Sequence, residues 1–180
     1  MSTPVDLLKN STAIFTLGPE GTFSDEAARV FQNKPDLLRY SSTFSEALLQ
    51  VSQNPKSAAV VPIENSVAGT VAQVQDALVS MDLVILGEVS LPITYSLLAS
   101  ADPKEIKNCY THSQAFEQTS RWSAKNLPHV SPQFTRSNID SGLQFLEKAE
   151  QGDESVAAIV PVSFAMKHPQ YLFAENIQDY

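Results

Sequence analysis

Two nearly identical apolar runs, one in each half of the chain, constrain the fold more than any other feature. Ala-Ala-Val-Val-Pro-Ile occupies residues 58–63, and Ala-Ala-Ile-Val-Pro-Val occupies residues 157–162. Uninterrupted apolar runs of this length are typical of strands buried on both faces, as in parallel sheets covered by helices. Each run also follows a capped helical pattern and a polar loop. We therefore predict two similar βαβ lobes.

Strand-like and helix-like segments alternate along the whole chain. Strands are expected at residues 13–17, 37–42, 109–111 and 130–134, and helices at residues 26–32 and 112–122. Capping signals at Thr22, Thr43 and Ser137 each stand before a helical pattern. Residues 83–98 are apolar but interrupted by Gly87, Glu88 and Pro92, which favours two strands joined at a bend.

The predicted fold class is α/β, with two βαβ lobes, a ligand cleft between them and an architecture like that of periplasmic binding proteins. We expect lobe 1 to comprise residues 1–92 plus 163–180, and lobe 2 to comprise residues 93–162. Open α/β sheets bind ligands outside the carboxyl ends of their strands. Polar residues at those ends are therefore the candidates for function.

Charge and composition restrict the class of partner. A net charge of -8 with 12 Lys and Arg argues against nucleic acid or an anionic membrane. The single cysteine, Cys109, excludes an internal disulfide. The N-terminus lacks the pattern of a secretion signal, and no apolar segment approaches the ~20 residues of a membrane helix. These features lead us to expect a cytoplasmic protein.

The first apolar run ends in a polar junction. Glu64, Asn65 and Ser66 follow it directly, and Gly69 and Thr70 then open a helical pattern. Backbone N–H groups at such a helix start lack partners and carry partial positive charge, so they suit an anionic ligand. An ordinary turn with a helix cap accounts for the same residue types equally well.

Two more polar junctions have the same position relative to predicted strands, at residues 18–24 and 111–118. Glycines at 18 and 21 do not form a nucleotide loop, since the spacing and lysine of the P-loop are absent. Gln114 at a helix start could donate to a carboxylate. His112 could act in catalysis, although a lone histidine is more often structural. His129 and His168 lack partners at ligand spacing, so no metal site is predicted.

These motifs, in this order, resemble the catalytic domain of prephenate dehydratase. Gly-Pro-Glu-Gly-Thr-Phe-Ser at residues 18–24 is similar to the family's opening motif, and Glu-Asn-Ser at 64–66 to its substrate motif. His-Ser-Gln-Ala at 112–115 resembles a His-Pro-Gln-Ala segment, with Ser113 in place of proline. Asn-Ile-Gln-Asp at 176–179 resembles the lead-in to the last motif. The resemblance runs from about residue 14 to 179.

The resemblance implies a lyase of L-phenylalanine biosynthesis that converts prephenate to phenylpyruvate with loss of water and carbon dioxide. It implies no cofactor and no metal, a small-molecule substrate, and a homodimer as the assembly. The catalytic residues it implies are Asn65, Ser66 and Gln114. Those implied to bind substrate are Thr22, Glu64, Asn65, Ser66, Gly69, Thr70, His112 and Gln114. A structural role is favoured for Glu64, because its carboxylate would repel a dianion unless it is turned away or protonated.

One departure from the family pattern bears on activity. In the family a Thr-Arg-Phe motif follows the Asn-Ile-x-Asp lead-in, with a threonine held to be essential, whereas this sequence stops at Tyr180. Thr135-Arg136 precedes a serine and lies elsewhere, so it does not replace that motif. We therefore expect impaired dehydration from this sequence. The alternatives are a prephenate decarboxylase that retains the hydroxyl group, and a non-catalytic protein that binds a prephenate-like ligand.

Overall fold

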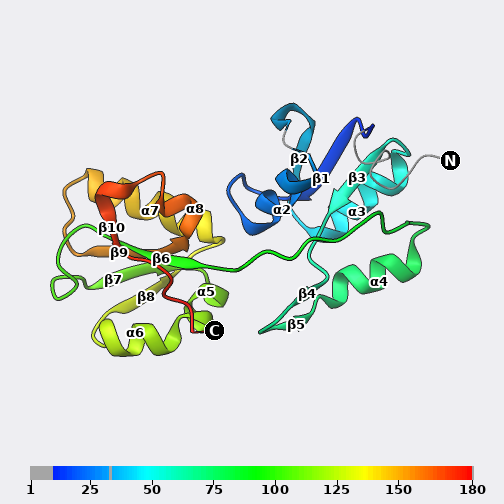
Figure 1. Ribbon diagram of the computed structural model, residues 1–180. Coiled ribbons are helices and arrows are strands. Elements are labelled where there is room, and N and C mark those ends of the chain that lie inside the picture. Colours follow the sequence, from blue (N-terminus) through cyan, green and yellow to red (C-terminus); the bar gives the residue numbers. More distant parts are fainter. Residues whose placement is uncertain (1–9, 33, 180) are drawn as a thin grey trace. The chain divides into compact units, whose positions relative to one another are not determined.

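The computed structural model describes residues 10–32 and 34–179 (Figure 1). The chain divides into two compact units, Met1–Leu91 (unit 1) and Pro92–Tyr180 (unit 2). Each contains a sheet with three parallel strands and helices between them, so the predicted α/β class with two lobes is confirmed.

Unit 1 is built on a three-stranded parallel sheet with the order β2-β1-β3. Its core forms where Ile14 of the central strand packs with Ala28, Leu38 and Ala58, all buried. Apolar side chains at these positions supply the hydrophobic free energy that holds the helices on the sheet. The elements are β1 (Ala13–Leu17), α2 (Phe23–Phe31), η1 (Pro35–Leu37), β2 (Leu38–Ser41), α3 (Phe44–Gln53) and β3 (Ser57–Val60).

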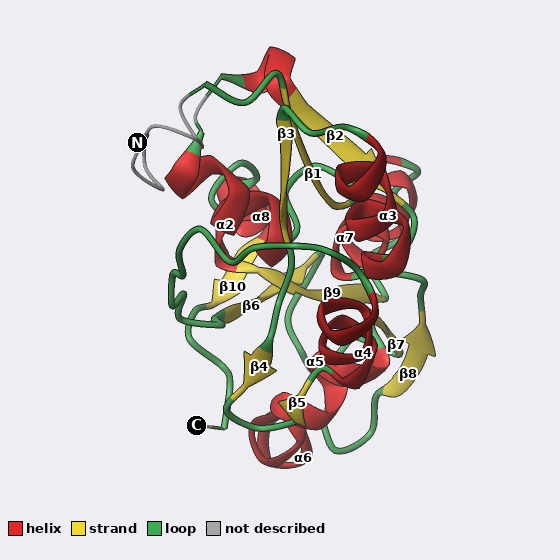
Figure 2. Ribbon diagram, turned by 90° about the vertical axis from the view of Figure 1, so that its right-hand side faces the viewer, coloured by secondary structure: helices red, strands yellow, loops and turns green. Residues whose placement is uncertain are grey.

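The segment after β3 differs from the sequence prediction. Strands β4 (Glu64–Asn65) and β5 (Gly69–Thr70) pair antiparallel, and Figure 2 shows them as two short arrows. Helix α4 (Ala72–Ser80) begins only after them, with Val71 as an N-cap that makes no side-chain hydrogen bond. The expected helix start at Gly69 is therefore wrong. Residues 69 and 70 pair with β4 instead, and the left-handed backbone of Gly69, at φ 77°, suits the end of a tight hairpin loop.

Unit 2 contains a five-stranded mixed sheet with the order β10-β6-β9-β7-β8. Strands β7, β8 and β9 run parallel, while β6 is antiparallel to β9 and to β10. Figure 1 shows α7 and α8 on one side of this sheet and α5 and α6 on the other. The strands are β6 (Tyr95–Ala99), β7 (Asn108–Thr111), β8 (Ser131–Phe134), β9 (Val156–Pro161) and β10 (Leu172–Ala174). The helices are α5 (Ser113–Gln118), α6 (Ser120–Asn126), α7 (Asn138–Glu150), α8 (Val162–Ala165) and η2 (Pro169–Tyr171).

The three parallel strands of each unit share one topology. In unit 1 the chain forms β1, β2 and β3 in the order β2-β1-β3, and in unit 2 it forms β7, β8 and β9 in the order β8-β7-β9, with helices between the strands. The two apolar runs correspond to β3 and β9, the third parallel strand of each unit. The resemblance between these runs thus reflects equivalent places in the two sheets.

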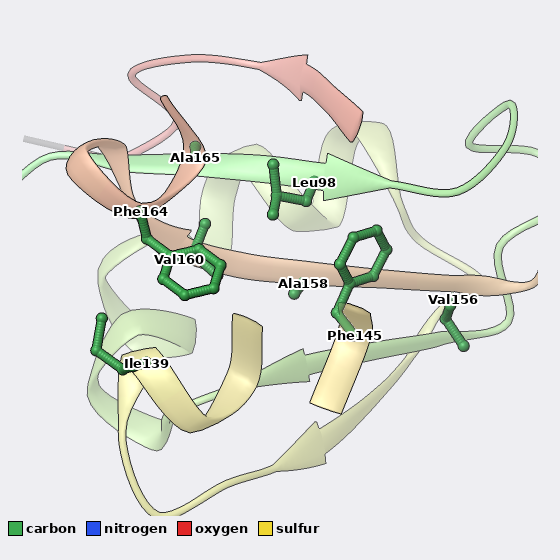
Figure 3. Close-up of a cluster of buried hydrophobic side chains, with 8 residues drawn as sticks. All are labelled: Leu98, Ile139, Phe145, Val156, Ala158, Val160, Phe164 and Ala165. Atoms are coloured by element: carbon green, nitrogen blue, oxygen red, sulfur yellow. The ribbon is translucent and has the colours of Figure 1, made fainter. Parts of the chain in front are cut away.

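The core of unit 2 lies between α7 and the sheet (Figure 3). Phe145 of α7 is fully buried against β9, whose six residues are all buried. Phe164 of α8 closes the same cluster beside Ile139. Full burial of a side chain such as Phe145 stabilises the fold by roughly 1.5–3 kcal/mol relative to exposure.

Residues after β9 belong to unit 2, which corrects the expected assignment of 163–180 to lobe 1. Strand β10 pairs with β6, and α8 packs against β6 and β9. The expected pair of strands within residues 83–98 is also corrected. Only residues from Tyr95 onward form a strand, because β9 and β10 supply hydrogen-bonding partners to β6. Residues 83–94 are extended without pairing to any strand in the described part of the chain.

Candidate functional site

The Glu-Asn-Ser junction is organised by the side chain of Asn65. Its Oδ1 accepts hydrogen bonds from the backbone N–H groups of Val67, at 2.9 Å, and Ala68, at 3.0 Å. These bonds close the three-residue loop between β4 and β5, so the carbonyl end of the amide is occupied. The Nδ2 group meets no acceptor among residues 10–32 and 34–179, which leaves two N–H donors for a ligand.

The other residues of this hairpin are exposed. Glu64 pairs with Thr70 and Asn65 with Gly69 across the two strands. Ser66 lies in the exposed loop that joins them. The hairpin therefore presents a hydroxyl group, an amide and a carboxylate to the surroundings without burying any of them.

The loop at residues 18–24 follows β1 and is held by the hydroxyl group of Thr22. This hydroxyl donates to Leu17 O at 3.0 Å and accepts from Asp25 N at 3.3 Å, where Thr22 serves as the N-cap of α2. Its proton is thus directed at the protein's own backbone. In this structure Thr22 stabilises the loop. To donate to a ligand, its hydroxyl group would have to give up the hydrogen bond to Leu17 O.

The buried carboxylate of Asp25 also holds the loop at residues 18–24 in place. Asp25 is 2% exposed, and its Oδ2 accepts from Gly21 N at 2.9 Å and from Arg29 Nε at 3.0 Å. Its Oδ1 accepts from the Tyr40 hydroxyl at 2.7 Å. Burial, together with this bond to Asp25, raises the pKa of Tyr40 to about 12, while the bond to Asp25 raises the pKa of Arg29. Arg29 also pairs with Glu20 of the loop at 2.9 Å.

The loop at 18–24 and the hairpin at 64–70 belong to the same edge of the unit 1 sheet. They follow β1 and β3, which are parallel neighbours, so both leave the carboxyl ends of their strands. The hydroxyl of the fully buried Thr16 lies 2.9 Å from Val60 O, at the end of β3, and 3.1 Å from Ser24 O, at the start of α2. Both predicted junctions therefore follow the carboxyl ends of neighbouring parallel strands of unit 1.

The third junction lies at the carboxyl end of β7 in unit 2. His112 is the N-cap of α5 and makes no side-chain capping bond, while its carbonyl oxygen accepts from Phe116 N. Gln114 is exposed in the first turn of α5, whereas Gln118 at the end of α5 is buried. Gln114 is therefore the residue of α5 whose amide is open to a ligand.

No group of three or more His, Cys, Asp or Glu residues suited to a metal ion occurs in the described ranges. Cys109 is buried in β7, and burial raises the pKa of its thiol to about 12, so it stays protonated and unreactive. None of the helices described for the chain is long and apolar enough to cross a membrane.

A hollow of about 280 Å³ lies elsewhere in unit 2. Trp122 and His129 line it together with Phe173 and the segment that precedes β7. It contains none of the residues predicted to bind substrate. The hollow is therefore separate from the candidate functional residues.

The strand topology and the three polar junctions define an α/β protein of two lobes, each with three parallel strands. Its candidate ligand-binding residues follow the carboxyl ends of those strands. The sequence profile of the family described as prephenate dehydratase matches residues 14–180. The chain belongs to the prephenate dehydratase family, as its motifs predicted.

Individual relatives agree with this assignment. A bifunctional chorismate mutase/prephenate dehydratase of Aquifex aeolicus is 31% identical over 173 residues, which cover 96% of this chain and 46% of that protein. A prephenate dehydratase of Methanocaldococcus jannaschii is 32% identical over 176 residues, covering 95% of this chain and 61% of the relative. The chain spans about half the length of the curated relatives it matches.

Solved structures show the same fold. The crystal structure of a prephenate dehydratase of Arthrobacter aurescens in complex with L-Phe has a TM-score of 0.79 and 32% identity, with 93% of this chain and 56% of that chain covered. The prephenate dehydratase of Staphylococcus aureus has a TM-score of 0.75 and 29% identity over 93% of this chain and 61% of its own. These similarities agree with the predicted fold class.

Two sets of contacts at these junctions were missed by sequence reasoning. Asp25 and Arg29 stand four residues apart on α2, and this spacing could have predicted their ion pair. The contacts of Asp179 with α6 join residues at least 57 positions apart, so no local pattern signals them.

Proposed function

We propose that the chain catalyses the conversion of prephenate to phenylpyruvate, water and carbon dioxide, as a lyase of phenylalanine biosynthesis. The observation that carries this proposal is the family match over residues 14–180. The hairpin at 64–70 supports it, because Asn65 holds its own loop through Oδ1 while Nδ2 stays available.

The reaction needs two bonds to break in concert with aromatisation of the ring. The C–C bond to the ring carboxylate breaks, its electron pair enters the ring, and the C4 hydroxyl group leaves as water after accepting a proton. Aromatisation supplies the driving force. The residues then act by orienting the dianion and by placing donors where charge changes.

The proposed catalytic residues are Asn65, Ser66 and Gln114, which offer amide and hydroxyl donors to the carboxylates and the departing hydroxyl group. His112, Gly69 and Thr70 complete the proposed substrate contacts. Glu64 is exposed and paired across the hairpin, which fits a structural part better than a contact with a dianion. Thr22 contributes by fixing the loop at 18–24.

Assembly, partners and location complete the proposal. The resemblance to the family supports a homodimer and a cytoplasmic location, and the net charge of -8 supports the expectation of no nucleic-acid partner. Light scattering on the purified protein tests the assembly, since a monomer mass would refute the dimer.

Product identification tests the proposed reaction. The purified chain is incubated with prephenate, beside a sample without protein, and the products are followed by NMR. Phenylpyruvate formed faster than in the protein-free sample supports the proposal. A non-aromatic product of CO₂ loss would replace it with a decarboxylase, and binding without turnover would replace it with a ligand-binding protein.

A further inference from the structure

The segment Asn-Ile-Gln-Asp at residues 176–179, which follows β10, is tied to unit 2 at successive residues. The left-handed backbone of Asn176, at φ 54°, turns the chain, and the fully buried Ile177 then donates its N–H to Tyr95 O at 3.0 Å. Tyr95 N in turn donates to Gln178 Oε1 at 3.1 Å. The segment is thus fastened to the first residue of β6.

Asp179 reaches further, to the break between α5 and α6. Its N–H donates to the carbonyl oxygen of Gln118, the last residue of α5, at 2.8 Å. Its Oδ2 accepts from Ser120 Oγ at 3.1 Å and from Arg121 N at 2.9 Å, and its Oδ1 accepts from Trp122 N at 3.1 Å. One residue therefore holds the end of one helix and the start of the next.

The first turn of α6 depends on the carboxylate of Asp179, because the side chain of its N-cap residue accepts no hydrogen bond from the helix. Thr119 stands at the N-cap position, yet its buried hydroxyl donates backwards to Ala115 O at 2.8 Å. The first N–H groups of α6 would then lack acceptors. Asp179 supplies the acceptor that an N-cap side chain normally provides, and its negative charge suits the positive end of the helix.

A helix as short as α5, with six residues, has little stability of its own, so its orientation depends on tertiary contacts. This helix carries Gln114 and begins after His112. We propose that Asp179 is a positioning residue that holds α5 so that Gln114 is presented to the substrate. The inference rests on the proposed function for its substrate, and on the contacts above for its geometry.

The test compares Asp179→Ala and Asp179→Asn with the wild-type chain in two measurements. The first is hydrogen exchange at the amides of Arg121 and Trp122, and the second is steady-state turnover of prephenate. Asp179→Asn keeps an oxygen acceptor and the shape of the side chain, and therefore guards against a variant that fails to fold. Ser120→Ala removes one of the three side-chain bonds and gives a graded intermediate.

Asp153→Ala is the matched control. Asp153 Oδ1 also accepts from a backbone N–H and a serine hydroxyl, both of Ser155, at 2.9 and 2.7 Å. Asp153 lies in the loop between α7 and β9. Its substitution therefore removes a hydrogen-bonding carboxylate from unit 2 at a position away from α5. Its exchange at Arg121 and its kinetics should match those of the wild type.

We expect Asp179→Ala to raise exchange at both amides by about tenfold or more, since these bonds then open locally. The KM for prephenate should rise about five- to tenfold with a smaller change in kcat, since Gln114 is displaced. Asp179→Asn should restore part of both effects. Faster exchange with an unchanged KM would make Asp179 purely structural and overturn the inference, as would unchanged exchange. Absence of turnover in the wild-type chain would instead refute the proposed function.

Discussion

Asp25 is expected to be a large single contributor to the stability of unit 1. It is 2% exposed and accepts three hydrogen bonds, from Gly21, Arg29 and Tyr40. Each hydrogen bond to a charged group contributes about 1.5–3 kcal/mol. Arg29 and Tyr40 are partly exposed and can bind water once the carboxylate is gone. The loss is therefore smaller than the sum, and we expect Asp25→Ala to lower the free energy of unfolding by about 2–4 kcal/mol.

Urea unfolding followed by far-UV circular dichroism measures this loss. Fluorescence is unsuited to it, because Trp122 is the single tryptophan and lies in unit 2. Glu20→Gln is the matched control, because it removes an ion pair to the same Arg29. The Glu20 side chain is 66% exposed. That change should cost less than about 1 kcal/mol. A loss below about 0.5 kcal/mol for Asp25→Ala would refute the view that these bonds hold the loop at 18–24.

Three further outcomes concern buried positions of unit 2. Gly142→Ala should lower the free energy of unfolding by about 1–3 kcal/mol, because the added Cβ would collide with the ring of Phe164, despite the better helix propensity of alanine. The control is Leu143→Ala, at an exposed position of α7, which should change the free energy of unfolding by less than about 1 kcal/mol. Urea unfolding measures both variants. Cys109 should resist thiol reagents at neutral pH until the chain unfolds, and rapid labelling of the folded protein would contradict its burial. Burial raises the pKa of this thiol from 9.0 to about 12. The stability that the buried thiol contributes is therefore present below pH 9.0 and is lost as the pH rises towards 12. Urea titrations of the wild type and Cys109→Ala across this pH range would detect the loss.

Local chemistry was sufficient to predict much of the fold. Strand β1 has the predicted bounds, and Thr22, Thr43 and Ser137 are the N-caps of α2, α3 and α7, each accepting from the backbone N–H three residues on. A hydroxyl at the N-cap satisfies a helix donor wherever the helix later packs, so the signal survives tertiary folding.

The misses have a different cause, which is hydrogen bonding to partners outside the expected element. Gly69 and Thr70 were expected to open a helix, but pairing with β4 drew them into a strand. The expected single helix at residues 112–122 is broken at Thr119, where Asp179 holds both sides. Residues beyond 162 pair with β6, which no local pattern indicates. Propensity is a weak guide wherever tertiary contacts supply the hydrogen-bonding partners.

The site could be predicted from its residue types but not from its hydrogen bonds. Asn65 was expected to bind substrate, and the structure adds that its Oδ1 already holds Val67 and Ala68. Thr22 was expected to donate to substrate, yet its proton is directed at Leu17. Which atoms of a polar side chain remain available follows only from the folded neighbours.

The kinetics of Asn65 variants with prephenate test the proposed site most directly. Asn65→Ala should lower kcat/KM for phenylpyruvate formation by roughly 10- to 100-fold, as the loss of one or two hydrogen bonds to a charged group would. Asn65→Asp keeps the acceptor for Val67 and Ala68 and thus the turn, but it replaces the Nδ2 donor with negative charge. We predict that it is at least as damaging as alanine. Wild-type kcat/KM in Asn65→Asp would show that Asn65 only shapes its loop, and would contradict the placement of prephenate at this hairpin.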